Sequence, residues 1–231
     1  GMTLTHAFMP LFSDLSARFE EDKIRQVYTV ASKYVVALLM PLGVGVVLVG
    51  GPFLGIWIGP EFQENGELIL LLLVLFTMVP MINPFANRYL TGIGKHGIYA
   101  KVTPIAALVN LGLSILLVKP LGLWGVAFAS LIPVFFVVPT ILIYACRQMG
   151  LPVHIYLKSS VLPALLPTLT MAVIVGLYRA QFGLIGYGHL LLAVVIGMAV
   201  YFPLFALFGL NAQERQFVLG KIWRVGLGKK T

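Results

Sequence analysis

Apolar runs long enough to cross a lipid bilayer dominate this sequence and leave few folds open. A helix needs about 20 apolar residues to span the roughly 30 Å hydrocarbon layer, because each residue adds about 1.5 Å. Only 10% of the residues are charged, against about 25% in soluble domains, and the mean hydropathy is +0.97. The predicted spans are residues 34–56, 68–90, 102–118, 121–145, 161–178 and 190–210.

Helices, not β-strands, are expected for these six segments. Lipid offers the backbone no hydrogen-bond partners, so a membrane-crossing chain forms helices or a closed barrel. The alternation of polar and apolar residues that barrel strands require is not sustained in any of the segments. We therefore expect an all-α fold, a polytopic bundle of six transmembrane helices.

The six predicted spans divide the chain into three parts. Residues 1–32 are expected to hold the end of a truncated span and a cytoplasmic segment, 33–210 the six-helix lobe, and 211–231 a basic cytoplasmic tail. The charged segment 13–32 can place its apolar residues on one helical face, which predicts either an interfacial helix or a solvated loop helix.

Two prolines interrupt the second predicted span. Pro80 and Pro84 each lack the backbone N–H that an α-helix needs, so we expect a kink there. Asn83 and Asn87 are four residues apart and therefore share one helical face. The sequence thus predicts a broken helix that carries amide groups at membrane depth.

The third predicted span also carries polar residues on one face. Thr103, Asn110 and Ser114 repeat at helical spacing, while all eight carboxylates of the chain lie outside the predicted spans. Residues of this kind can simply bridge helices, at about 0.6 kcal/mol each. They can also line a polar cavity, and proline-broken helices around a cavity are typical of transporters.

Positive charge is distributed unevenly between the two sides that six spans define. Both chain ends lie on one side, which receives every Lys and Arg except Lys119 and Arg179. Because Lys and Arg of short loops stay in the cytoplasm, we expect both termini to be cytoplasmic. Arg179, on the opposite side, is expected to be nearly dispensable. The net charge of +8 is therefore interpreted as a topology signal and not as a nucleic-acid-binding surface.

Residues that carry catalysis or bind metals form no recognisable set. The segment 92–95 reads Gly-Ile-Gly-Lys, but His96 stands where a phosphate loop needs Ser or Thr. The histidines lie apart, without the spacing of metal ligands, and Cys146 is the only cysteine, so no disulfide can form within the chain. We therefore expect no enzymatic activity, no metal and no cofactor.

Several short motifs follow one another along the chain. They are Met9-Pro10-x-x-Ser13-x-x-x-Ala17, Ile56-Trp-Ile-Gly-Pro-Glu-Phe62, Gly92-x-Gly-Lys95, Asn110-Leu-x-Leu-Ser-x-x-Leu-Val118 and Pro120-x-Gly122-x-x-Gly125-Val-Ala127. In their order and spacing these motifs resemble the second half of bacterial polysaccharide exporters and O-antigen flippases, which belong to the multidrug/oligosaccharidyl-lipid/polysaccharide exporter superfamily.

The resemblance implies that this chain is one lobe of a two-lobed flippase in the bacterial inner membrane. Such a protein moves an undecaprenyl-pyrophosphate-linked oligosaccharide across the bilayer for polysaccharide or lipopolysaccharide biosynthesis. Its expected partners are this lipid-linked substrate, membrane lipid and a missing N-terminal lobe. The candidate substrate-binding residues are Asn83, Asn87, Arg88, Lys101, Asn110 and Ser114.

Three alternatives stay open at this point. A multidrug cation extruder of the same superfamily is favoured by a carboxylate within a span, and this chain has none. A membrane-embedded enzyme needs a nucleophile or acid–base set near the interface, which the scattered histidines do not supply. A subunit that serves assembly alone is the third alternative.

Overall fold

The computed structural model describes residues 8–211 and residue 214, and this part of the chain is helical without a strand. The all-α prediction is therefore confirmed. The helices are α2 (Phe8–Ala17), α3 (Glu21–Trp57), α4 (Glu61–Met81), α5 (Ala86–Gly92), α6 (Gly97–Leu121), α7 (Leu123–Gln148), α8 (Val153–Tyr156), α9 (Leu162–Phe182) and α10 (Tyr187–Leu204). Two π-helical turns, η1 (Leu157–Val161) and η2 (Phe205–Gly209), continue α8 and α10.

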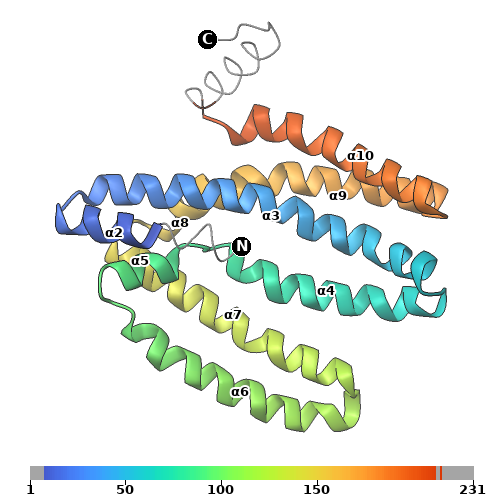
Figure 1. Ribbon diagram of the computed structural model, residues 1–231, viewed down its shortest axis with the longest axis horizontal. Helices are drawn as coiled ribbons and strands as arrows, with labels where there is room; N and C mark the ends of the chain where they lie inside the picture. Colours follow the sequence, from blue (N-terminus) through green and yellow to red (C-terminus); the bar gives the residue numbers. More distant parts are fainter. Residues whose placement is uncertain (1–7, 212–213, 215–231) are drawn as a thin grey trace, which may run out of the picture.

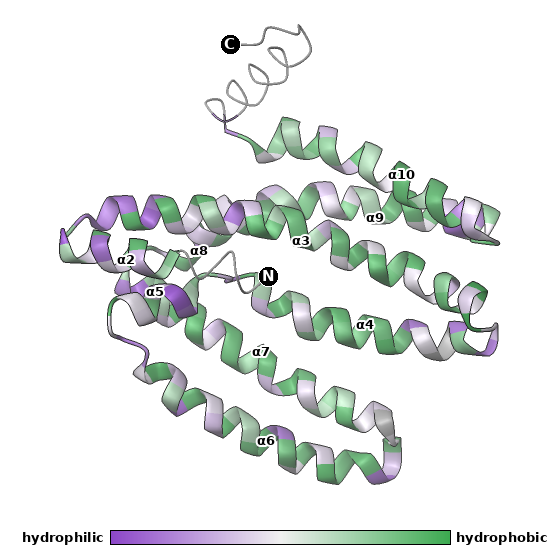
Figure 2. Ribbon diagram, viewed as in Figure 1, coloured by the Kyte–Doolittle hydropathy of each residue, from purple (hydrophilic) through white to green (hydrophobic). Residues whose placement is uncertain are grey.

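Six helical stretches of the described chain are long and apolar enough to cross a membrane, which confirms the predicted number and indicates a membrane protein. Figure 2 shows them as long, mainly hydrophobic ribbons. They are Glu21–Trp57, Glu61–Gly92, Gly97–Leu121, Trp124–Gln148, Val153–Phe182 and Tyr187–Gly209. Each overlaps one predicted segment, and most extend beyond it because polar turns continue the helices past the apolar residues.

The helices run back and forth, so that their ends gather at two opposite ends of the bundle (Figure 1). α4 and α9 both pack against α3, and α10 packs against α9 and α3. The α6–α7 hairpin joins this group through the contact of α7 with α4. Helix α6 lies at the margin of the bundle, and none of its 25 residues is buried.

The charged segment near the start of the chain is helical and is divided between α2 and α3. Helix α2 ends at Ala17, Phe19 adopts a positive φ of 57°, and α3 then continues without a break from Glu21 to Trp57. Arg25 forms ion pairs with Glu21, four residues away, and with Asp22, three residues away, on the same helix. These pairs, with acidic residues at the positive end of the helix dipole, stabilise the polar first turns as part of α3.

A dense aromatic core occupies the end of the bundle where α2, α3, α5, α7 and α8 meet. Phe12, Tyr28, Tyr89 and Tyr156 are all buried there. The Phe12 and Tyr89 rings meet edge to face, 5.7 Å apart, and so do the Tyr28 and Tyr89 rings at 5.9 Å. Edge-to-face pairs stabilise packing beyond the burial of their surface, so we expect this end of the bundle to be more stable than the part near α6, which has no buried residue.

Two ion pairs join helices at opposite ends of the bundle. The buried Lys33 of α3 binds Glu214, beyond α10. At the other end, Arg179 of α9 binds Glu67 of α4 and donates a 2.9 Å hydrogen bond to the Leu48 carbonyl of α3. Arg179 thus joins three helices. These contacts give Arg179 a structural role that its position in the sequence did not indicate.

Candidate functional site

The break between α4 and α5 falls at the two prolines, as predicted. Helix α4 ends at Met81, residues 82–85 form a turn, and α5 begins at Ala86. The turn frees the Ile82 carbonyl, which accepts a 2.8 Å hydrogen bond from the Tyr156 hydroxyl of α8. The hydrogen bond from Tyr156 therefore attaches the break to the aromatic core. Asn83 lies in this break and lines a pocket beside it.

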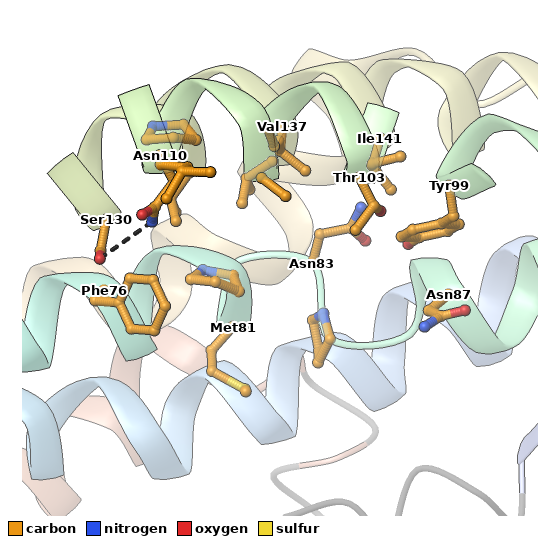
Figure 3. A pocket seen from close by; sticks show the side chains of 18 of the residues that line it. Phe76, Met81, Asn83, Asn87, Tyr99, Thr103, Asn110, Ser130, Val137 and Ile141 are labelled. Atoms are coloured by element: carbon orange, nitrogen blue, oxygen red, sulfur yellow. Dashed lines mark hydrogen bonds between the residues drawn. The ribbon is translucent and has the colours of Figure 1, made fainter. Parts of the chain in front are cut away.

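A pocket of about 670 Å³ lies beside this break, between α4 and α5 on one side and α6 and α7 on the other (Figure 3). Asn83, Asn87, Asn110 and Ser114 all line it, so the structure brings together the four uncharged candidate residues. Apolar residues, among them Phe76, Pro80 and Pro133, form much of the remaining wall.

Asn110 connects α6 and α7 in the wall of the pocket. Its Nδ2 donates a 3.1 Å hydrogen bond to the Ser130 hydroxyl of α7, drawn in Figure 3. Ser114 donates to the Asn110 Oδ1 at 3.2 Å. Polar residues of this span were expected either to bridge helices or to line a polar cavity. Asn110 does both, because it bonds Ser130 of α7 and lines the pocket.

Asn83 is the most enclosed polar side chain of the pocket wall. It is 8% exposed, and its Oδ1 accepts a hydrogen bond from the buried Tyr28 hydroxyl of α3. Its Nδ2 has no hydrogen-bond partner among the described residues. In Figure 3 the side chain extends toward Thr103 of α6. The wall thus contains a buried donor that no described residue satisfies.

Arg88 and Lys101, the two cationic candidates, do not line the pocket. Lys101 is exposed on the first turns of α6, and Arg88 is half-buried on α5. Residues two positions apart on a helix point in nearly opposite directions. Because Thr103 lines the pocket, Lys101 on the same helix points away from it. The structure therefore places both cations near the pocket along the chain but outside its wall.

Three residues that contribute polar atoms to the pocket were not among the candidate substrate-binding residues, although one of them, Thr103, was placed on the polar face of the third predicted span. Tyr99 lies on the first turn of α6, and Ser130 lies in the middle of α7. A lone serine inside an apolar span was the available signal for Ser130. No comparable signal marked Tyr99, because tyrosine is common at membrane interfaces.

The pocket is uncharged. Its lining contains amides, hydroxyls and apolar groups, with no Asp, Glu, Lys, Arg or His side chain. Across the described residues, His, Cys, Asp and Glu side chains form no group of three that could hold a metal ion. What the arrangement can do chemically is donate and accept hydrogen bonds beside apolar rings.

Comparison of the sequence with protein-family models and with curated proteins, and of the structure with solved structures, finds no match. The resemblance to polysaccharide exporters therefore depends on the motifs of the sequence alone. The helical membrane fold and the uncharged pocket are the findings from which a function has to be argued.

Proposed function

We propose that this chain is one lobe of a transporter that flips a lipid-linked oligosaccharide across the bacterial inner membrane. The observation that carries the proposal is a pocket with amide and hydroxyl groups in its largely apolar wall, within a bundle of membrane-spanning helices. It adjoins α4, which is broken at two prolines, and α6, which has no buried residue. Irregular backbone at membrane depth is typical of transporters, where it lines a cavity.

The physical barrier to flipping is the loss of water by the sugar headgroup. A hydroxyl or amide that enters an apolar medium without a partner costs about 2–7 kcal/mol. The amides and hydroxyls of the pocket would replace part of this hydration, and the lipid chain would stay in the bilayer along the exposed apolar side of α6. Ile105, Leu108 and Leu116 on α6 are each more than 60% exposed, as contact with lipid requires.

The orientation belongs to the same proposal. Among the described residues, every Lys and Arg except Lys119 and Arg179 belongs to the connections at the end of the bundle that holds α2, α5 and α8, or to the helical turns that lead from that end. Under the positive-inside rule that end faces the cytoplasm, together with both termini. The turn before α4, with Glu61, then faces the periplasm.

A second lobe is part of the proposal, because the pocket of this chain borders only one helical bundle. The test is reconstitution in liposomes with a fluorescent lipid-linked oligosaccharide, with this lobe alone and co-expressed with a candidate N-terminal lobe. We expect flipping with both lobes and none above protein-free liposomes with this lobe alone. Flipping by the isolated chain, or export of a lipophilic cation in place of the lipid, would contradict the proposal.

The alternative of a multidrug cation extruder is less well supported by the site. A cation that enters a low-dielectric cavity needs an anionic partner, and the pocket wall contains no carboxylate. The uncharged wall thus favours a polar, neutral group over a cation.

A further inference from the structure

We propose that the pocket between α4–α5 and α6–α7 binds the uncharged sugar part of the substrate, and that the pyrophosphate remains outside it. This inference rests on the proposed function and assigns one part of the substrate to one site. It gives the uncharged candidates that line the pocket a role separate from that of Arg88 and Lys101, which do not line it.

The first argument is the charge of the wall. A pyrophosphate group carries several negative charges, and an anion in a low-dielectric cavity requires paired cations and donors. Arg and Lys serve as such partners in phosphate sites. Neither residue type lines this pocket, since Arg88 and Lys101 both lie outside its wall. The pocket therefore excludes the anionic part and accepts a neutral one.

The second argument is the unsatisfied donor of Asn83. The hydrogen bond from Tyr28 to Oδ1 fixes the orientation of the amide and leaves Nδ2 as the group without a partner. A buried donor of this kind is costly unless an acceptor arrives. Hydroxyl and acetamido oxygens of a sugar are neutral acceptors, and they would pair with Nδ2 without bringing a charge into the bilayer.

The third argument is the combination of polar and apolar surfaces. The Asn110 Nδ2 and Oδ1 each make one hydrogen bond within the chain, and each can make one more. Phe76, Pro80 and Pro133 provide flat apolar surfaces in the same pocket, which match the C–H faces of a sugar ring. The volume of about 670 Å³ falls within the roughly 300–1,000 Å³ of small-molecule sites.

The test is calorimetric titration of the full chain in detergent micelles. The probes are a panel of neutral disaccharides that includes N,N′-diacetylchitobiose, and inorganic pyrophosphate. We expect saturable binding of at least one disaccharide and no competition by pyrophosphate. The absence of saturable binding across the panel would overturn the proposal, and so would pyrophosphate binding that depends on Asn83 or Asn110.

Variants locate the binding. Asn83→Leu and Asn110→Leu each replace the hydrogen-bonding atoms by methyl groups with the same number of side-chain heavy atoms, and each should weaken disaccharide binding roughly tenfold. Thr140→Val is the matched control, because the Thr140 hydroxyl bonds the Phe136 carbonyl on its own helix and lies outside the pocket. Equal affinity of the Asn variants and the control would overturn the assignment.

Folding of each variant is checked by circular dichroism and gel filtration. If Asn110→Leu fails to fold, Thr103→Val takes its place, because Thr103 is exposed in the same wall and its loss removes no helix bridge. The liposome assay separates the two proposals. Flipping without pocket-dependent sugar binding refutes only the pocket assignment, whereas sugar binding without flipping by the two-lobe protein refutes the proposed function.

Discussion

Gly125 allows α7 to pass directly against the backbone of α6. A Cβ atom at this position would lie 2.2 Å from the Leu117 carbonyl oxygen, much closer than any side chain tolerates. The neighbour is backbone and cannot rotate away, so a larger residue must push the two helices apart. The pocket wall depends on this approach, because α6 and α7 each contribute residues to it.

Gly125→Ala should therefore destabilise the hairpin by about 1–3 kcal/mol. A lowered midpoint of thermal unfolding in detergent measures the effect. Gly112→Ala on the same hairpin is the matched control, because a Cβ there meets no atom within 4 Å and alanine favours the helix. A midpoint for Gly125→Ala as high as that of the control would show that α6 and α7 are not in close contact.

Arg88 should affect transport without affecting sugar binding, because it lies outside the pocket wall. In a two-lobe transporter we expect Arg88→Lys to impair flipping, since lysine keeps the charge but loses the forked geometry that binds phosphate oxygens. Arg88→Gln should impair flipping more. Disaccharide affinity should stay unchanged in both variants.

The control for Arg88 is Lys119→Gln at the opposite end of the bundle, where Lys119 is exposed. Arg179 is unsuitable as a control, because its loss would leave Glu67 and the Leu48 carbonyl without a partner. Wild-type flipping by both Arg88 variants at matched expression would show that Arg88 only anchors the helix at the membrane surface.

At the scale of elements, the contact between Lys33 and Glu214 attaches the segment after α10 to α3. Burial raises the pKa of Glu214, but hydrogen bonds from Lys33 and from the Asn211 backbone N–H outweigh burial and hold the pKa below its ordinary value of 4.5. The Asn211 bond is 2.8 Å long, and a Glu side chain that accepts from the backbone N–H three residues earlier is one half of a capping box.

This contact should be sensitive to acid. A carboxylate whose pKa is lowered by folding contributes stability at pH values above its unfolded pKa, and this stability is lost as the pH falls through the folded value. We expect the segment around Asn211 to stay attached to α3 at pH 7, and to detach only when the pH has fallen below the ordinary value of 4.5 and through the lower folded pKa of Glu214. Spin labels placed at Thr29 and Asn211 would report the change as a longer distance.

Glu214→Gln removes the charge at every pH and should detach the segment already at pH 7. Glu61→Gln is its control, because Glu61 lies at the start of α4, at the other end of the bundle. A distance that is the same in Glu214→Gln and in the control would show that the ion pair does not hold the segment.

At the scale of the whole molecule, the six spans predict that successive connections between helices lie alternately in the periplasm and in the cytoplasm. Reporter fusions after Gly59, Pro120 and Gly183 should give periplasmic signals, and fusions after Gly94 and Gly150 cytoplasmic ones. The reason is that each pair of neighbouring fusion sites is separated by one of the six spans. A cytoplasmic signal at Gly59 would contradict both the orientation and the number of spans that precede it.

The sequence by itself determined the number of spans and the break at Pro80 and Pro84. Both follow from local properties. A span is recognised because bilayer thickness requires an apolar run of a certain length, and a break is recognised because proline has no N–H to donate. The ends of α3 were predicted less well, because ion pairs within a helix can extend it beyond the apolar residues.

Only the tertiary structure decided which polar groups meet. Asn83 accepts a hydrogen bond from Tyr28, 55 residues away in the sequence. Asn110 donates one to Ser130, 20 residues away on the next helix. The same packing turns Lys101 away from the pocket that Thr103 lines. Helical periodicity states which residues share a face, but the direction of that face depends on the neighbouring helices, whose positions follow from packing between distant segments.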